Sequence, residues 1–211
     1  MENILLSSRA FINKKITQGF LSLLGNTNFD SDQLVIIVNS VREGKKHPQM
    51  IELQQTVKLL GFKKVILFDV LSDDPVILKT AKGIILNGGY EFLLLDSLKK
   101  SGLIDFLKSL AVQGKPFYGI SAGAIVLGPD LDLYNVIYPE DNFNNTSELT
   151  AINATDIRIY PHYDKHIEIN QQLETTIKYF EKQTKTEVTR LDNEQAILIK
   201  NNCLQLLTAI N

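Results

Sequence analysis

Short apolar runs alternate with amphipathic helical segments along roughly the first 120 residues of the chain. The runs are rich in Leu, Ile and Val and contain few polar positions, which is typical of strands covered on both faces. Strand and helix alternating at short spacing predict βαβ units, and therefore an α/β fold with a doubly wound, mostly parallel sheet. The predicted strands are 3–6, 34–38, 65–68, 83–86 and 117–120.

Helical spacing of apolar residues connects these runs. It is present at 11–24 and 50–60, and again over a longer stretch at 92–110 in which Gly102 is a natural break. Each segment is long enough to cross one face of a sheet and return the chain to the starting edge of the next strand.

The pattern changes after Pro129. Residues 130–155 are polar and rich in Asn and Asp, so they predict a long irregular excursion, a kind of segment that often carries function. The remaining elements are predicted as a strand at 157–160, an amphipathic helix at 167–183, and closing, partly antiparallel strands at 188–191, 196–199 and 204–210.

Composition limits the function classes. A chain of 211 residues with 44% apolar residues is expected to form one domain, 1–211. A net charge of −2 without a basic stripe argues against nucleic acid, and no apolar run approaches the length of a membrane span. The first residues, MENILLSS, have neither the basic nor the long apolar region of a secretory signal, which predicts a cytoplasmic protein. A monomer or homodimer is expected. With one cysteine and three histidines, neither a metal nor a cofactor is expected.

The segment Gly119-Ile120-Ser121-Ala122-Gly123 lies between a predicted strand and a predicted helix. A G-x-S-x-G at this place forms a sharp turn that exposes the serine hydroxyl, and the next backbone N–H and the helix N-terminus favour an oxyanion there. Glycine and serine are also common in ordinary turns between strand and helix. The motif alone therefore leaves a nucleophile and a plain turn as equal alternatives.

Two further segments follow predicted strands. The glycine pair Gly88-Gly89 ends the strand at 83–86, where a backbone N–H could approach a reacting carbonyl, although a plain turn fits as well. His162 follows the strand at 157–160 and could meet a nucleophile, or could be a solvated loop residue. His166, four residues later, is expected at the rim of the pocket. Acids that could orient an imidazole lie between the serine and the histidine.

Taken together, these segments resemble the peptidase E (aspartyl dipeptidase) family of serine peptidases, whose fold is similar to that of class I glutamine amidotransferases and is flavodoxin-like. The resemblance extends from Leu59 to His166, with a weaker echo in LDNEQAILIK near the C-terminus. The segments that carry it, in order, are LGFKKVILFDVLSDDP, IILNGGYEFLLLDSLKKSGL, GKPFYGISAGAIVLGPD and IYPHYDKH.

The resemblance implies a role for each matching residue. Ser121 would be the nucleophile, His162 the general base, and the N–H groups of Gly89 and Ala122 the oxyanion donors. The family's acid lies between serine and histidine. An ungapped alignment backward from His162 places Glu140 there, with Asp141 as the alternative. The implied reaction is hydrolysis of short peptides, dipeptides with N-terminal aspartate above all, through an acyl-enzyme.

Two departures concern the substrate. The family commonly has Gly-Gly-Asn-Thr where this chain has Gly88-Gly89-Tyr90-Glu91, which changes the pocket wall around Gly88 and Tyr90. Some members also carry an arginine after the histidine that suits a substrate carboxylate. This chain has none between 159 and 189, which leaves Lys165 or Arg158 to attract such a group.

Several rival functions share these motifs. A cyanophycinase-like enzyme, another hydrolase of small peptides or esters, and a non-catalytic binding module that keeps the fold are the alternatives. An α/β-hydrolase esterase is a poorer match, because its histidine lies much farther along the chain from the serine.

Overall fold

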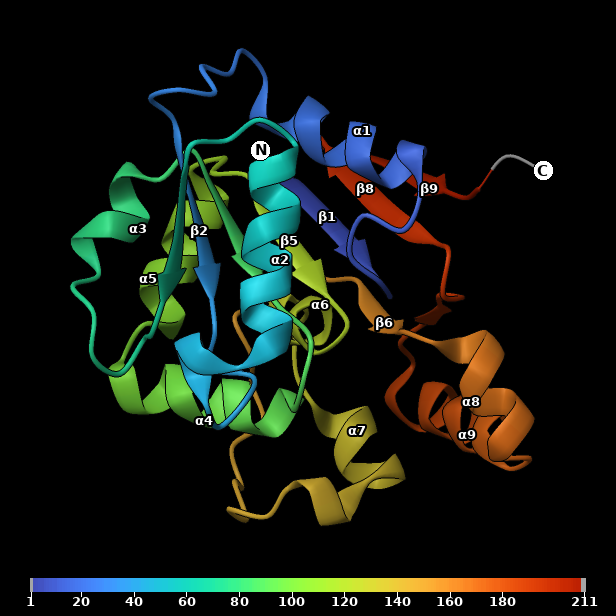
Figure 1. The fold of residues 1–211 in the computed structure, drawn as a ribbon. Coiled ribbons are helices and arrows are strands. Elements are labelled where there is room, and N and C mark those ends of the chain that lie inside the picture. Colours follow the sequence, from blue (N-terminus) through green and yellow to red (C-terminus); the bar gives the residue numbers. More distant parts are fainter. Residues whose placement is uncertain (1, 210–211) are drawn as a thin grey trace.

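A computed structural model describes residues 2–209 (Figure 1). Its central sheet has seven strands in the order β3-β2-β4-β5-β1-β8-β9. The first five along the chain are parallel to one another, and β8 and β9 pair in antiparallel fashion, so the predicted mostly parallel α/β sheet is confirmed. These strands are β1 (Asn3–Ser7), β2 (Gln33–Ile37), β3 (Lys64–Phe68), β4 (Gly83–Leu86), β5 (Phe117–Ile120), β8 (Ala196–Lys200) and β9 (Cys203–Leu207).

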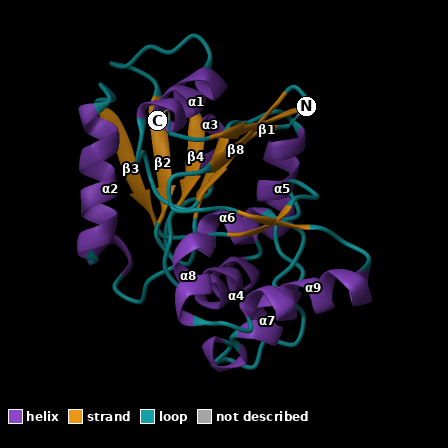
Figure 2. Ribbon diagram, turned by 90° about the vertical axis from the view of Figure 1, so that its right-hand side faces the viewer, coloured by secondary structure: helices purple, strands orange, loops and turns teal. Residues whose placement is uncertain are grey.

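Helices cover both faces of this sheet. Figure 2 shows α2 and α5 on opposite sides of it, with α7, α8 and α9 gathered beyond one edge. The helices are α1 (Lys14–Leu24), α2 (Pro48–Leu59), α3 (Val76–Thr80), α4 (Glu91–Ser101), α5 (Ile104–Val112), α6 (Ala122–Leu127), α7 (Asp132–Ile137), α8 (Tyr163–Ile169) and α9 (Leu173–Thr184), with short 3₁₀ turns η1 (Gly44–Lys46) and η2 (Pro139–Asp141). None of the helices within residues 2–209 is long and apolar enough to cross a membrane.

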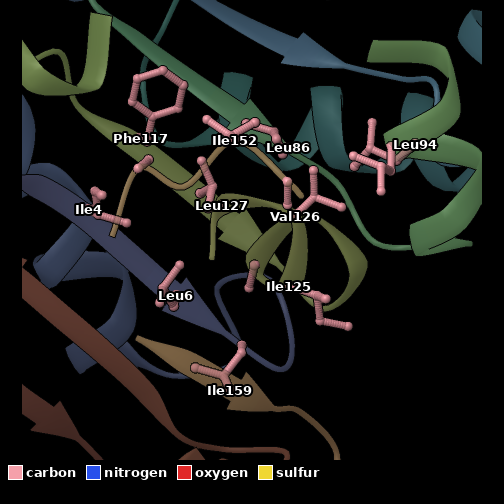
Figure 3. Close-up of a cluster of buried hydrophobic side chains, with 14 of the residues drawn as sticks. Ile4, Leu6, Leu86, Leu94, Phe117, Ile125, Val126, Leu127, Ile152 and Ile159 are labelled. Carbon is pink, nitrogen blue, oxygen red and sulfur yellow. The ribbon is translucent and has the colours of Figure 1, made fainter. Parts of the chain in front are cut away.

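Alternate side chains of each strand enter different hydrophobic clusters. Leu5 of β1 and Tyr118 of β5 pack with α1 and α2, whereas Ile4 and Phe117 face the larger cluster that contains α4, α5 and α6. Figure 3 shows part of that cluster, where Ile4, Phe117 and Val126 lie together. Burial on both faces explains why the strands are almost wholly apolar in sequence.

Local signals set several helix ends. The side chain of Asn13 accepts a hydrogen bond from the N–H of Ile16 at 3.0 Å and so begins α1. Gly102 has φ 70° and separates α4 from α5, which confirms the predicted break.

The second half of the chain differs from the prediction in three places. The excursion at 130–155 contains α7 and η2 rather than irregular chain alone. The helix predicted at 167–183 is divided into α8 and α9 at Asn170, whose side chain accepts from the N–H of Gln172. Strands β6 (Arg158–Tyr160) and β7 (Val188–Arg190) form a separate parallel pair. Ile210, the end of the predicted strand at 204–210, lies outside the described residues.

The carboxyl ends of β4, β5 and β1 lie side by side because these strands are neighbours in the sheet. Chain segments that leave these ends form a common edge, where open α/β sheets usually bind their ligands. The second strand pair and α8 lie beyond the same edge (Figure 1).

Candidate active site

Ser121 lies at the turn between β5 and α6 in a backbone conformation that a serine rarely adopts, with φ 49° and ψ −114°. Such a conformation costs about 1–3 kcal/mol and persists only where the surrounding structure imposes it. Gly119 and Gly123, two residues away on either side, allow α6 to approach the sheet closely. A Cβ at Gly119 would lie 2.5 Å from Cα of Ala124, and one at Gly123 would overlap the carbonyl of Leu86. The G-x-S-x-G segment therefore forms a strained elbow in which α6 packs directly on β4 and β5.

His162 faces this serine. Its Nε2 lies 2.9 Å from Oγ of Ser121. His162 is itself in a left-handed conformation, φ 59°, at the start of α8, and its N–H donates to Oγ of Ser8 at 3.1 Å. The hydrogen bond to Ser8 fixes the backbone of His162 next to the end of β1. The structure thus brings the two residues together in hydrogen-bonding geometry.

The group behind the imidazole is an amide. Nδ1 of His162 lies 2.6 Å from Oδ1 of Asn193, in the turn that precedes β8. The N–H of Asn193 donates to Oδ1 of Asp164 at 2.9 Å, which holds the turn in place. With Nδ1–H donating to the amide oxygen, Nε2 is left free to accept a proton from Ser121.

The prediction that Glu140, or Asp141, stands behind His162 is wrong. Both acids lie in η2, and within residues 2–209 neither forms a hydrogen bond with the imidazole. Glu140 is exposed, whereas Asp141 lines a separate pocket of about 330 Å³ together with Tyr90. The physical reason is that both acids follow Tyr138 in η2, whereas the pairing of β8 with β1 places the turn with Asn193 at the imidazole. Asn193 was missed because an Asp-Asn pair between strands reads as an ordinary turn.

Two backbone N–H groups beside Ser121 lack an acceptor. Within the described residues nothing accepts a hydrogen bond from the N–H of Gly89 or of Ala122. The loop that carries Gly89 is held by Ser40, whose Oγ donates to the carbonyl of Gly88 at 2.7 Å and whose carbonyl accepts from the N–H of Tyr90 at 2.8 Å. Both free donors are therefore available to a developing oxyanion.

A pocket of about 380 Å³ opens at Ser121 and His162. Its walls are residues 8–10, residues 87–89 and one face of α2. Of the predicted substrate-binding residues, Gly88 lines it, and a Cβ there would lie 3.2 Å from Cβ of Ser121.

The other predicted substrate-binding residues lie outside this pocket. Tyr90 lines the neighbouring pocket, and Lys165 is exposed and paired with Glu168. His166 bonds through Nδ1 to the hydroxyl of Tyr160 at 2.9 Å, and its ring centroid lies 5.7 Å from that of His162. Arg158 is buried and paired with Asp130.

A second polar cluster lies next to His162 and consists of Glu91, Tyr138, Tyr160 and His166. The hydroxyls of Tyr138 and Tyr160 are 2.6 Å apart. Burial raises the pKa of the Glu91 carboxyl to about 7, and the charge of Asp141 adds to this. Burial lowers the pKa of His166, and the neighbouring His162 lowers it further by a smaller amount. The two tyrosines and His166 are therefore mostly uncharged near neutral pH, whereas the Glu91 carboxyl is about half ionised at pH 7.

Metal-ligating side chains do not gather at this site. Across residues 2–209 no group of three or more His, Cys, Asp or Glu side chains is placed to hold a metal ion. The functional groups that the described residues place at the site are a serine hydroxyl, an imidazole and backbone donors.

The chain is similar to known peptidases. Its residues 8–207 match the model of peptidase family S51. It is 30% identical over 120 residues to an uncharacterized peptidase of Pasteurella multocida strain Pm70, covering 56% of each protein. It is 33% identical over 92 residues to peptidase E of Shewanella sp. strain MR-4, covering 42% of this chain and 36% of that protein. The matched part of the chain thus spans about half or less of the length of these relatives.

Solved structures share the fold. A candidate peptidase E protein from Listeria monocytogenes EGD-e superimposes with a TM-score of 0.78 over 100% of both chains at 22% identity. A peptidase from an acI-B1 actinobacterium gives a TM-score of 0.71 at 18% identity, over 99% of this chain and 88% of the other. The resemblance to peptidase E found in the sequence is confirmed, and the chain belongs to peptidase family S51.

Proposed function

We propose that this protein is a serine peptidase that hydrolyses short peptides through an acyl-enzyme on Ser121. The observation that carries the proposal is the hydrogen bond of 2.9 Å between Oγ of Ser121 and Nε2 of His162 on a strained elbow. Membership of family S51 supports the same reaction class.

The proposed first step is attack on the peptide carbonyl. Nε2 of His162 takes the hydroxyl proton of Ser121 while Oγ forms a bond to the carbonyl carbon. The negative charge moves to the carbonyl oxygen, where the N–H groups of Gly89 and Ala122 donate hydrogen bonds. The C–N bond then breaks as His162 returns the proton to the leaving nitrogen.

Water completes the cycle. His162 takes a proton from the water as the water oxygen attacks the ester carbon. The ester C–O bond then breaks as His162 returns the proton to Oγ, which releases the free acid and restores the serine hydroxyl. Asn193 holds the imidazole in the tautomer that both steps need. Unlike a carboxylate, the amide adds no negative charge to stabilise the imidazolium.

The size of the pocket supports a small substrate. A volume of about 380 Å³ is at the low end for small-molecule sites and suits a dipeptide better than a long peptide. Resemblance to peptidase E favours an N-terminal aspartate, and comparison of Asp-Leu, Asn-Leu and Leu-Leu tests that preference. Equal rates of hydrolysis for the three dipeptides would contradict a preference for N-terminal aspartate.

A fluorophosphonate probe tests the nucleophile directly. The probe is expected to label the wild-type protein at Ser121, and Ser121→Ala is expected to abolish both labelling and dipeptide hydrolysis. Ser109→Ala is the matched control because Ser109 is exposed on α5. Labelling that survives in Ser121→Ala contradicts the assignment.

A further inference from the structure

Two of the segments that line the pocket at Ser121 carry a charged residue. One wall is the face of α2 formed by Gln49, Glu52, Leu53 and Thr56, which recur at helical spacing. Another wall is the segment 8–10 that leaves β1, and it contributes Arg9. Glu52 and Arg9 are the charged side chains among the described residues that line the pocket, apart from any charge on His162.

The backbone of Arg9 is fixed next to the nucleophile. Its carbonyl accepts a hydrogen bond of 3.0 Å from Oγ of Ser7. Ser7 pairs with Ile120 in the register of β1 and β5, and its carbonyl accepts from the N–H of Ser121 at 2.8 Å. The side chain of Arg9 therefore starts from a rigid point beside the serine, although its guanidinium is exposed.

The guanidinium of Arg9 has no partner among residues 2–209, and this distinguishes it from the other arginines. Arg158 is paired with Asp130, and Arg190 with Glu174 and Glu181. Arg42 lies over the ring of Phe143 and lines a different pocket. Arg9 thus lines the pocket that contains Ser121 and has a planar set of donors without an internal acceptor.

We propose that Arg9 is a specificity-determining residue that binds a carboxylate of the substrate beside Ser121. The inference rests on the proposed function in that it takes the substrate to be a short peptide. A guanidinium recognises a carboxylate through paired hydrogen bonds, which an amide of the same shape cannot accept equally well.

Glu52 makes the recognition more selective. With opposite charges among its lining residues, the pocket suits a molecule that carries both an ammonium group and a carboxylate. A free dipeptide has both groups, whereas an internal segment of a long chain has neither. The carboxylate is either the side chain of an acidic first residue or the C-terminal group, and the test separates these sources.

Binding to the inactive Ser121→Ala protein tests the inference without any turnover. The probes are Asp-Leu, Asn-Leu and their C-terminal amides, and the Kd of each is measured by calorimetry in Ser121→Ala with and without Arg9→Met. Arg9→Met is expected to raise the Kd about 10- to 100-fold for the peptides that keep the recognised carboxylate, and less than about threefold for Asn-Leu amide.

The pattern of losses identifies the source. If Arg9→Met weakens the binding of both Asp peptides, the recognised carboxylate is the aspartate side chain. If it weakens the binding of both unamidated peptides, the recognised carboxylate is the C-terminal group. Arg9→Lys should restore binding only in part, because it keeps the charge and not the paired donors. Lys14→Met is the control, since Lys14 is an exposed cation outside this pocket.

Two results overturn the inference. One is an equal change in Kd for all four peptides on Arg9→Met. The other is no change, or no measurable binding to Ser121→Ala, for any of them. Both are distinct from failure of the proposed function, which shows as absent probe labelling and absent hydrolysis in the wild-type protein.

Discussion

Nδ1 of His162 and Oδ1 of Asn193 are 2.6 Å apart, so a neutral amide occupies the position that a carboxylate holds in a Ser-His-Asp triad. The amide can fix the orientation and tautomer of the ring. It cannot offset the positive charge that the ring acquires as it takes the serine proton. A carboxylate provides both orientation of the ring and stabilisation of its positive charge, whereas the amide provides the orientation alone.

Substitution of Asn193 should change the rate in opposite directions. Asn193→Ala removes the partner of Nδ1 and is expected to lower kcat by about 10- to 1,000-fold, because the wrong tautomer becomes accessible. Asn193→Asp keeps the acceptor, adds a charge and is expected to raise kcat by about 10-fold. Steady-state kinetics on one dipeptide measure both. Asn144→Ala, an exposed site, is the control, and a change below threefold in Asn193→Ala contradicts the orienting role.

Substitution of Gly89 should damage catalysis selectively. Gly89 has φ 143°, and a Cβ there would overlap the carbonyl oxygen of Ser40, so Gly89→Ala displaces the free N–H. Loss of one oxyanion donor is expected to lower kcat by about 100- to 1,000-fold. Gly102→Ala is the matched control, with φ 70° but open space around it, and it should cost about 1 kcal/mol of stability with normal kcat. Similar kcat values for the two variants would refute the oxyanion assignment.

The strain at Ser121 should be measurable as stability. Ser121→Gly relaxes a conformation that Ser121→Ala retains, so the glycine variant is expected to have the higher free energy of unfolding, by about 1 kcal/mol in urea. At Ser109, within α5, the order should reverse because glycine is the poorer helix former. The same order at both positions would mean that the elbow stores no strain.

Glu91 should make stability fall as pH rises. Its pKa of about 7 lies above the ordinary 4.5, so the folded state holds the proton longer than the unfolded state does. Below about pH 4.5 the carboxyl is protonated in both states and does not lower the free energy of unfolding. Between about pH 4.5 and pH 7 the unfolded state ionises first, so the free energy of unfolding falls. At pH 8 Glu91→Gln is expected to exceed the wild type by about 2–3 kcal/mol, and at pH 4 to equal it.

Urea denaturation at the two pH values measures this difference. Glu140→Gln is the control, because Glu140 is exposed in η2. A Glu91→Gln advantage that is the same at pH 4 and pH 8 would exclude titration of Glu91 as its cause.

The sheet could be predicted from the sequence because each of its parallel strands is a continuous apolar run between helical segments. The elements after Pro129 were harder to predict. At Asn170 a local side-chain bond ends α8, and helical periodicity carries no sign of it. Strands β6 and β7 were expected individually, but a pattern within one strand cannot reveal which strand it pairs with.

The site was predictable where chemistry and local geometry coincide. Ser121 is marked by the glycines that its elbow requires, and His162 by its place just after a strand. Asn193 and Arg9 carry no such mark. Arg9 is brought to Ser121 by the pairing of β1 with β5, and the turn with Asn193 is placed by the pairing of β8 with β1.

The place of β1 in the sheet has a consequence for synthesis. β1 leaves the ribosome well before β8, although the two strands are neighbours in the sheet. The turn with Asn193 becomes fixed only when β8 pairs with β1. A nascent chain can therefore assemble the elbow and its two backbone donors well before the imidazole is held by Asn193. Activity should emerge abruptly once β8 has paired with β1 rather than grow as the chain lengthens.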